Sequence, residues 1–126
     1  MDSVTLAFLG DAFFELSVRR RLVERGSAYT ADKLHFAAVH YVKASSQAEA
    51  VRRLITDGIL SSEELEVVRK ARNRKPKSVP KHTDPVDYKL ATAFEALLGY
   101  HYHGGREERA EDLTALAMDT IDRGVT

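Results

Sequence analysis

The stretch LAFLGDAFFEL, residues 6–16, places apolar side chains at positions 6, 9, 13 and 16, which is the spacing of an α-helix. The same stretch holds Gly10 and two carboxylates, Asp11 and Glu15. A helix that is apolar around most of its circumference is expected to be buried on several sides, and a carboxylate buried there needs a hydrogen bond, a cation or a metal ion. Because glycine disfavours a helix interior by about 1 kcal/mol relative to alanine, Gly10 indicates close approach of another segment.

Glycines and N-cap residues mark the ends of the next helices. The first helix is predicted to run to Glu24 and to stop at Gly26, and Thr30 is a suitable N-cap for a second helix. A third helix is predicted from about Ser45 to Gly58. The apolar positions that characterise the second and third helices are Leu34, Ala38, Tyr41, Ala48, Val51, Leu54 and Ile55.

Capping signals also define the second half of the chain. Ser61 and Glu64 have the spacing of a capping box, in which each side chain satisfies a free backbone N–H group, so a fourth helix begins there. Asp84 stands directly before Pro85, which predicts the start of a fifth helix that ends at Gly104. A sixth helix is predicted to fill most of the chain after that point.

Length and composition limit the class of protein. A chain of 126 residues can bury one core and is too short to divide comfortably into two, so we expect a single domain, residues 1–126. No segment alternates as a half-buried strand does, so the expected fold class is all-α. The chain has no cysteine, no apolar run of about 18 residues and no signal-peptide pattern, which favours a cytoplasmic protein and neither secretion nor a membrane.

The charges are unevenly distributed, although the formal net charge is zero. Residues 69–83 contain no acid, while the rest of the chain is acidic. The fourth helix is predicted to lead into residues 72–83, where Pro76 and Pro80 disfavour a continuous helix, so these residues form a basic loop before the fifth helix. It suits phosphate contacts along a duplex, and the alternative is a solvated charged loop. The bases of the acid-free run 69–83 are Arg69, Lys70, Arg72, Arg74, Lys75, Lys77 and Lys81.

A second isolated acid lies in KLATAFEALLGYHY, residues 89–102. Glu95 is the only acid between Asp87 and Glu107, and it stands beside an apolar stripe. If the first and fifth helices pack together, Asp11 and Glu95 can meet and offer hard oxygen ligands to Mg²⁺. The alternative is that each carboxylate is paired with a base or lies at the edge of the core.

Four blocks resemble the ribonuclease III family, in the same order along the chain. LAFLGDAFFEL resembles its signature helix, and TAFEALLGYHY, residues 92–102, resembles its second acidic helix. LHFAAVHYVKASSQAEAV (34–51) and RNRKPKSVPKHTDPVDY (72–88) resemble the middle helices and the loop of Mini-ribonuclease III, the short form that lacks a double-stranded-RNA-binding domain. The resemblance extends from Leu6 to about Tyr102.

This resemblance implies an all-helical, homodimeric, Mg²⁺-dependent endoribonuclease that cuts double-stranded RNA and leaves short 3′ overhangs. Its substrate class would be precursor 23S ribosomal RNA of the large subunit, processed in the cytoplasm, or in the plastid stroma of a plant. Asp11 and Glu95 match the family's catalytic, metal-binding acids. The expected RNA-binding residues are Arg72, Arg74, Lys75 and Lys77, with Val79, Pro80, Lys81, His82 and Thr83 as the part that enters a groove.

The chain departs from full-length ribonuclease III at two positions. Ala7 and Thr92 stand where that form has further acids, a reduction that the short form shares. The reduction leaves open how many metal ions bind. It also keeps a second hypothesis in play, a catalytically inactive module that binds RNA or a protein, and a third, a helical scaffold without an RNA role.

Overall fold

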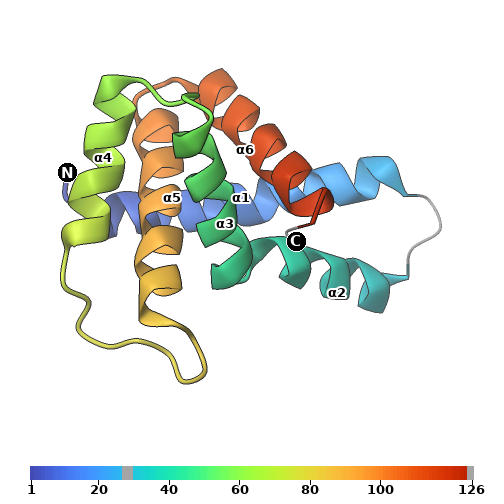
Figure 1. Ribbon diagram of the computed structural model, residues 1–126. Coiled ribbons are helices and arrows are strands. Elements are labelled where there is room, and N and C mark those ends of the chain that lie inside the picture. The colour runs from blue at the N-terminus through green and yellow to red at the C-terminus, as the bar shows by residue number, and fades with distance from the viewer. Residues whose placement is uncertain (27–29, 125–126) are drawn as a thin grey trace.

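The computed structural model describes residues 1–26 and 30–124, and this part of the chain contains six helices and no strand (Figure 1). The all-α prediction is therefore confirmed. None of the described helices combines the length and the apolar character that crossing a membrane requires. The helices are α1 (Ser3–Arg25), α2 (Ala31–Val42), α3 (Ala44–Thr56), α4 (Ser62–Asn73), α5 (Pro85–His103) and α6 (Glu107–Asp122).

The helices begin and end close to the residues that the local signals predict. Thr30 caps α2 through a hydrogen bond from the Lys33 amide, and Asp84 caps α5 with Pro85 in its first turn. The Ser61 capping box is complete, because its hydroxyl accepts the Glu64 amide and the Glu64 carboxylate accepts the Ser61 amide. Side chains within three residues of the helix end satisfy these amides, which is why sequence alone locates them.

The helix α5 lies at the centre of the molecule, where α1, α3 and α4 all contact it (Figure 1). The contact with α1 contains Phe14 and Phe94, both fully buried, with their rings edge to face at 5.3 Å between centroids. Edge-to-face packing matches the positive edge of one ring to the negative face of the other. This aromatic contact holds together the two helices that carry the isolated acids.

Gly10 and Gly99 allow α1 and α5 to cross at very short range. A Cβ atom added to Gly10 would lie 1.7 Å from the Glu95 carbonyl oxygen, and one added to Gly99 would lie 1.9 Å from the Leu6 carbonyl oxygen. Any side chain at either position would therefore push the backbones apart. The prediction that Gly10 marks a close approach is confirmed, and the segment it meets is the one that carries Glu95.

The apolar sequence of α1 predicted that this helix is buried on several sides, and this prediction is wrong. Phe8 is 82% exposed and Leu16 is 71% exposed, and Asp11 is exposed as well. Of the apolar positions on one side of α3, Ile55 stays 40% exposed, whereas Ala48, Val51 and Leu54 are buried. The six helices enclose only one face of α1, so one apolar stripe of this helix has no partner within residues 1–26 and 30–124.

Candidate functional site

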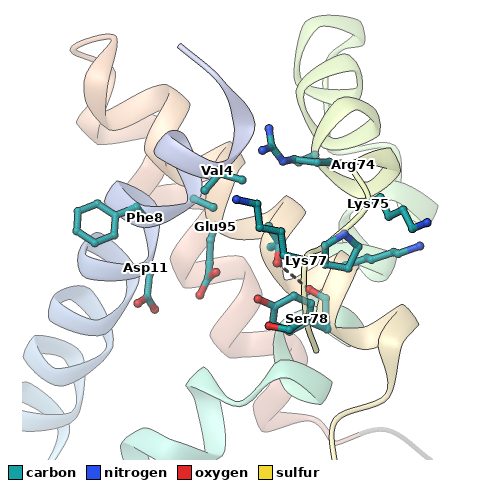
Figure 2. Close-up of a pocket in the computed structure, with 14 residues that line it drawn as sticks. Val4, Phe8, Asp11, Arg74, Lys75, Lys77, Ser78 and Glu95 are labelled. Carbon is teal, nitrogen blue, oxygen red and sulfur yellow. Dashed lines mark hydrogen bonds between the residues drawn. The ribbon is translucent and has the colours of Figure 1, made fainter. Parts of the chain in front are cut away.

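The Asp11 and Glu95 carboxylates meet at the crossing of α1 and α5. Asp11 follows Gly10 directly, so the glycine that permits the close approach also brings this acid to α5. Figure 2 shows the two carboxylates side by side. Within residues 1–26 and 30–124 neither acid forms an ion pair with a base, and Glu95 accepts one hydrogen bond, from Gln47 at 3.2 Å.

Two like charges at this short range disfavour each other. Burial raises the pKa of Glu95, and the charge of Asp11 and a hydrogen bond with that side chain raise it further, while Gln47 acts in the opposite direction; the resulting pKa is about 8. Glu15 adds a smaller repulsion. A pair of carboxylates in this state takes up either a proton or a cation.

The acid pair opens onto a cleft of about 520 Å³. One wall comes from the first turns of α1, and another comes from the segment that links α4 to α5 (Figure 2). The cleft thus joins two acids on the helix side to several bases on the loop side. Its lining residues are Val4, Ala7, Phe8, Asp11, Ala71, Arg74, Lys75, Pro76, Lys77, Ser78, Tyr88, Lys89, Thr92 and Glu95.

The predicted RNA-binding residues divide into three groups in the structure. Arg74, Lys75 and Lys77 line the cleft beside the two acids. Arg72 lines a separate groove between α3, α4 and the start of α5, and Ile55 of α3 lines the same groove. The residues from Val79 to Thr83 do not line the cleft and form the far part of the loop.

The far part of the loop contains a tight turn. The Thr83 amide donates to the Pro80 carbonyl oxygen at 3.2 Å, and His82 has φ of 66°, in the left-handed region. A positive φ at the third residue of a four-residue turn is the signature of a type II turn, which favours glycine or asparagine there. Lys81 and His82 are exposed, so the turn presents them to solvent.

The cleft also contains three residues of α5 that the sequence analysis did not predict as RNA contacts: Tyr88, Lys89 and Thr92. Tyr88, Thr92 and Glu95 are four and three residues apart, so they lie on one helix face. That spacing from Glu95 is the sequence signal from which Tyr88 and Thr92 could have been predicted as site residues. The Thr92 hydroxyl donates to the Tyr88 carbonyl oxygen at 2.9 Å and so stays within its own helix.

The donor set is compatible with one hard divalent cation. The described part of the chain has no cluster of three or more His, Cys, Asp or Glu side chains that could hold a metal. The possible ligands at this site are the carboxylate oxygens of Asp11 and Glu95. Neither carboxylate forms an ion pair with a base in the described residues. Mg²⁺ commonly binds through one or two carboxylates and keeps several waters, and it would relieve the repulsion that raises the pKa of Glu95.

Comparison with known proteins identifies the family. The profile of the Ribonuclease III domain matches residues 4–106, which include both acids and the basic loop. The chain belongs to the ribonuclease III family. It is accordingly an endoribonuclease of the ribonuclease III type, and the family resemblance read from its four sequence blocks is confirmed.

The relatives within this family are short proteins of similar length. The chain is 45% identical to a Mini-ribonuclease 3 of Symbiobacterium thermophilum, over 98% of this chain and 93% of that one. It is 42% identical to a Mini-ribonuclease 3 of Brevibacillus brevis, over 96% and 88%. A crystal structure of a Fusobacterium nucleatum protein superposes with a TM-score of 0.82 at 28% identity, covering 94% of this chain and 93% of that one.

Proposed function

We propose that this ribonuclease III family member is a Mg²⁺-dependent endonuclease that cuts double-stranded RNA. The observation that carries the proposal is the cleft, in which the unneutralised pair Asp11 and Glu95 faces the bases Arg74, Lys75 and Lys77. A phosphodiester needs cations around its oxygens and an activated water beside its phosphorus. Acids that hold a metal ion and bases that hold phosphates supply these two requirements from opposite walls.

In this proposal Asp11 and Glu95 hold the metal ion through their carboxylate oxygens. When bound, Mg²⁺ supplies a Lewis acid that polarises a phosphoryl oxygen and lowers the pKa of a coordinated water. The exposed Asp11 lies at the mouth of the site and the less exposed Glu95 lies behind it. Thr92 and Ala7 complete this wall of the cleft without adding charge, so the chain itself supplies two acidic ligands there.

Contacts to the sugar–phosphate backbone are assigned to the basic wall and to Lys89. This lysine lies six residues before Glu95 on α5, which places its backbone about 9 Å along the helix axis from the acid. Bases at that distance from the metal ligands suit phosphates next to the scissile one. Binding through such charges is independent of base sequence, so the exposed turn at Lys81 and His82 is assigned to the adjoining groove of the duplex.

We further propose that the enzyme acts as a homodimer. The side chains of Val4, Phe8, Leu16 and Val23 fall on one stripe of α1, and all four are exposed. A contiguous exposed apolar surface favours a protein interface. Val4 and Phe8 also line the cleft, so a second copy on this stripe would place two cleavage sites near each other, one for each strand.

The substrate class is proposed from the family resemblance. The cleft and basic loop described above are suited to a paired RNA segment, and the proposed substrate is precursor large-subunit ribosomal RNA, trimmed where its ends pair.

The test is incubation of the purified protein with a duplex labelled on both strands, with Mg²⁺ or with EDTA. We expect Mg²⁺-dependent cuts in both strands and a protein that sediments as a dimer. Asp11→Asn should reduce the cleavage rate by at least about 10²–10³-fold, because it removes half of the charge that holds the metal, and should preserve the melting temperature. Asp112→Asn, an exposed acid on α6, is the control and should cut normally.

Other outcomes would redirect the proposal. Duplex binding without cleavage in any metal would favour the inactive RNA-binding module. Undiminished cleavage by Asp11→Asn would contradict the assigned metal site. Cleavage of only one strand by a monomer would remove the homodimer from the proposal and leave the nuclease.

A further inference from the structure

One buried polar side chain reaches the acid pair from a third helix. Gln47 in the first turn of α3 is only 2% exposed. Its Nε2 atom donates to Oε2 of Glu95 at 3.2 Å and to the Val42 carbonyl oxygen at 2.8 Å. The amide nitrogen thus bridges the end of α2 and the acid on α5.

The Val42 carbonyl fixes which way this amide points. It belongs to the last turn of α2, where carbonyl groups lack a partner within their own helix and need a donor from elsewhere. Rotating the amide by half a turn would direct its oxygen at this carbonyl and at a carboxylate oxygen, which are both acceptors. Both N–H groups are therefore committed, and Gln47 can only donate toward Glu95.

The oxygen of the Gln47 amide lowers the stability of the fold, because it is buried without a hydrogen-bond donor in the described residues. Oε1 of Gln47 is buried, and no hydrogen-bond partner for it is found in the described part of the chain. A buried acceptor without a donor costs about 1–3 kcal/mol, which offsets part of what the two Gln47 N–H groups contribute to stability. A role for the amide at the neighbouring acid accounts for a polar residue at this position.

We propose that Gln47 is a positioning residue of the metal site: its amide, held by the Val42 carbonyl, fixes Oε2 of Glu95 and thereby sets how the carboxylate lies beside Asp11. This inference rests on the proposed metal-binding role of the two acids. Gln47 does not line the cleft, so it acts through Glu95 and touches neither the RNA nor the metal ion directly. The site then has a supporting residue from α3 where further acids are absent on α1 and α5.

A neighbouring residue provides a matched control. Ser46 is also buried, also lies in the first turn of α3 and also donates to a carbonyl of α2, that of His40 at 2.6 Å. It makes no hydrogen bond to Glu95 in the described structure. Ser46→Ala therefore removes a buried contact between the same two helices and leaves the acid pair untouched.

The experiment compares Gln47→Met with Ser46→Ala in the full chain. Magnesium binding is measured by isothermal titration calorimetry without RNA, and single-turnover cleavage is measured over a range of Mg²⁺ concentrations. Loss of an outer-shell partner typically weakens metal affinity or activity about 10–100-fold. We expect such a loss of Mg²⁺ affinity in Gln47→Met and no change of affinity in Ser46→Ala, although each variant leaves a carbonyl of α2 without its donor and so lowers the melting temperature. Gln47→Asn keeps the amide on a shorter stem and should fall between the two.

Each result decides the inference. Wild-type affinity in Gln47→Met, or an equal loss in both variants, would overturn the positioning role, and so would a wild-type protein that binds no Mg²⁺. If the wild type binds Mg²⁺ but cuts no duplex, the proposed function fails, while a selective loss of affinity in Gln47→Met still supports the role of Gln47. A selective loss of both affinity and cleavage supports the two together.

Discussion

Glu64 of α4 and Glu95 of α5 show how one fold treats its acids differently. Glu64 of α4 is only 3% exposed and accepts hydrogen bonds from the Ser61 amide, from two Arg109 nitrogens at 2.9 Å and from His101 at 2.6 Å. Burial raises the pKa of Glu64, but these donors outweigh it and lower the pKa to about 2. Arg106 donates to the other ring nitrogen of His101, so the neutral ring donates to Glu64.

Glu95 has the opposite surroundings on the same helix bundle. It accepts a single hydrogen bond, from Gln47, and faces the carboxylate of Asp11 instead of an arginine. Its pKa rises to about 8, because burial and the neighbouring acid both disfavour its charged form. The Glu64 cluster is thus complete without a ligand and holds α4, α5 and α6 together. The Asp11–Glu95 pair is incomplete, and incompleteness of this kind is typical of a binding site.

The largest effect is expected from breaking the complete cluster. Glu64→Gln should lower the free energy of unfolding by about 3–5 kcal/mol, because it leaves the partly buried Arg109 without its partner. Urea denaturation at neutral pH measures this loss. Glu66→Gln is the control, since Glu66 pairs with Arg69 on the exposed face of the same helix and should change stability far less. Equal effects would mean that the buried cluster is not a centre of stability.

The Asp11–Glu95 pair should make the protein less stable as the pH rises. Because the pKa of Glu95 is raised from 4.5 to about 8, the folded state binds more protons than the unfolded state between these values, and stability falls as pH rises through them. Glu95→Gln should remove this fall, a difference of roughly 2 kcal/mol at pH 8 after allowance for partial exposure. Melting temperatures in EDTA measure it, with Glu108→Gln as the exposed control. Parallel curves for wild type and Glu95→Gln would contradict the repulsion.

Acid should act on Glu64 instead. Its pKa is lowered, so the stability that it contributes is present above about pH 4.5 and is lost as pH falls toward 2. The two glutamates therefore limit stability at opposite ends of the pH range.

Local signals predict most of the fold. The capping residues Thr30, Ser61 and Asp84 act on amides within three residues, so the helix starts follow directly from the sequence. Gly10 is informative for a related reason, because a glycine in a helix interior carries a cost that a close contact explains. Even so, sequence does not say which segment makes that contact, and only the assembled structure shows that it is the turn containing Glu95.

Burial and side-chain contacts that depend on residues far apart in the sequence are predicted less well. Phe8 and Leu16 look like core residues by composition, yet the bundle covers only one face of α1 and leaves them exposed. Gln47 is 48 residues from Glu95, and nothing in its local sequence indicates their hydrogen bond. Lys89 resembles any helix lysine until the cleft places it among the bases of the loop. The acids of the site are found by their isolation in apolar helices, whereas their supporting residues are found by contact.

The smallest effect expected is a change in salt dependence at the basic wall of the incomplete site. Replacing both Lys75 and Lys77 by Ala removes two cleft cations while the acids remain. The slope of log affinity for duplex RNA against log salt should decrease by about 1–2, because fewer counterions are released on binding. The measurement is fluorescence anisotropy in Ca²⁺ at several salt concentrations. Lys33→Ala with Arg123→Ala, two exposed bases outside the cleft and the basic loop, is the matched control and should keep the wild-type slope. An unchanged slope in the cleft variant would mean that Lys75 and Lys77 do not contact phosphate.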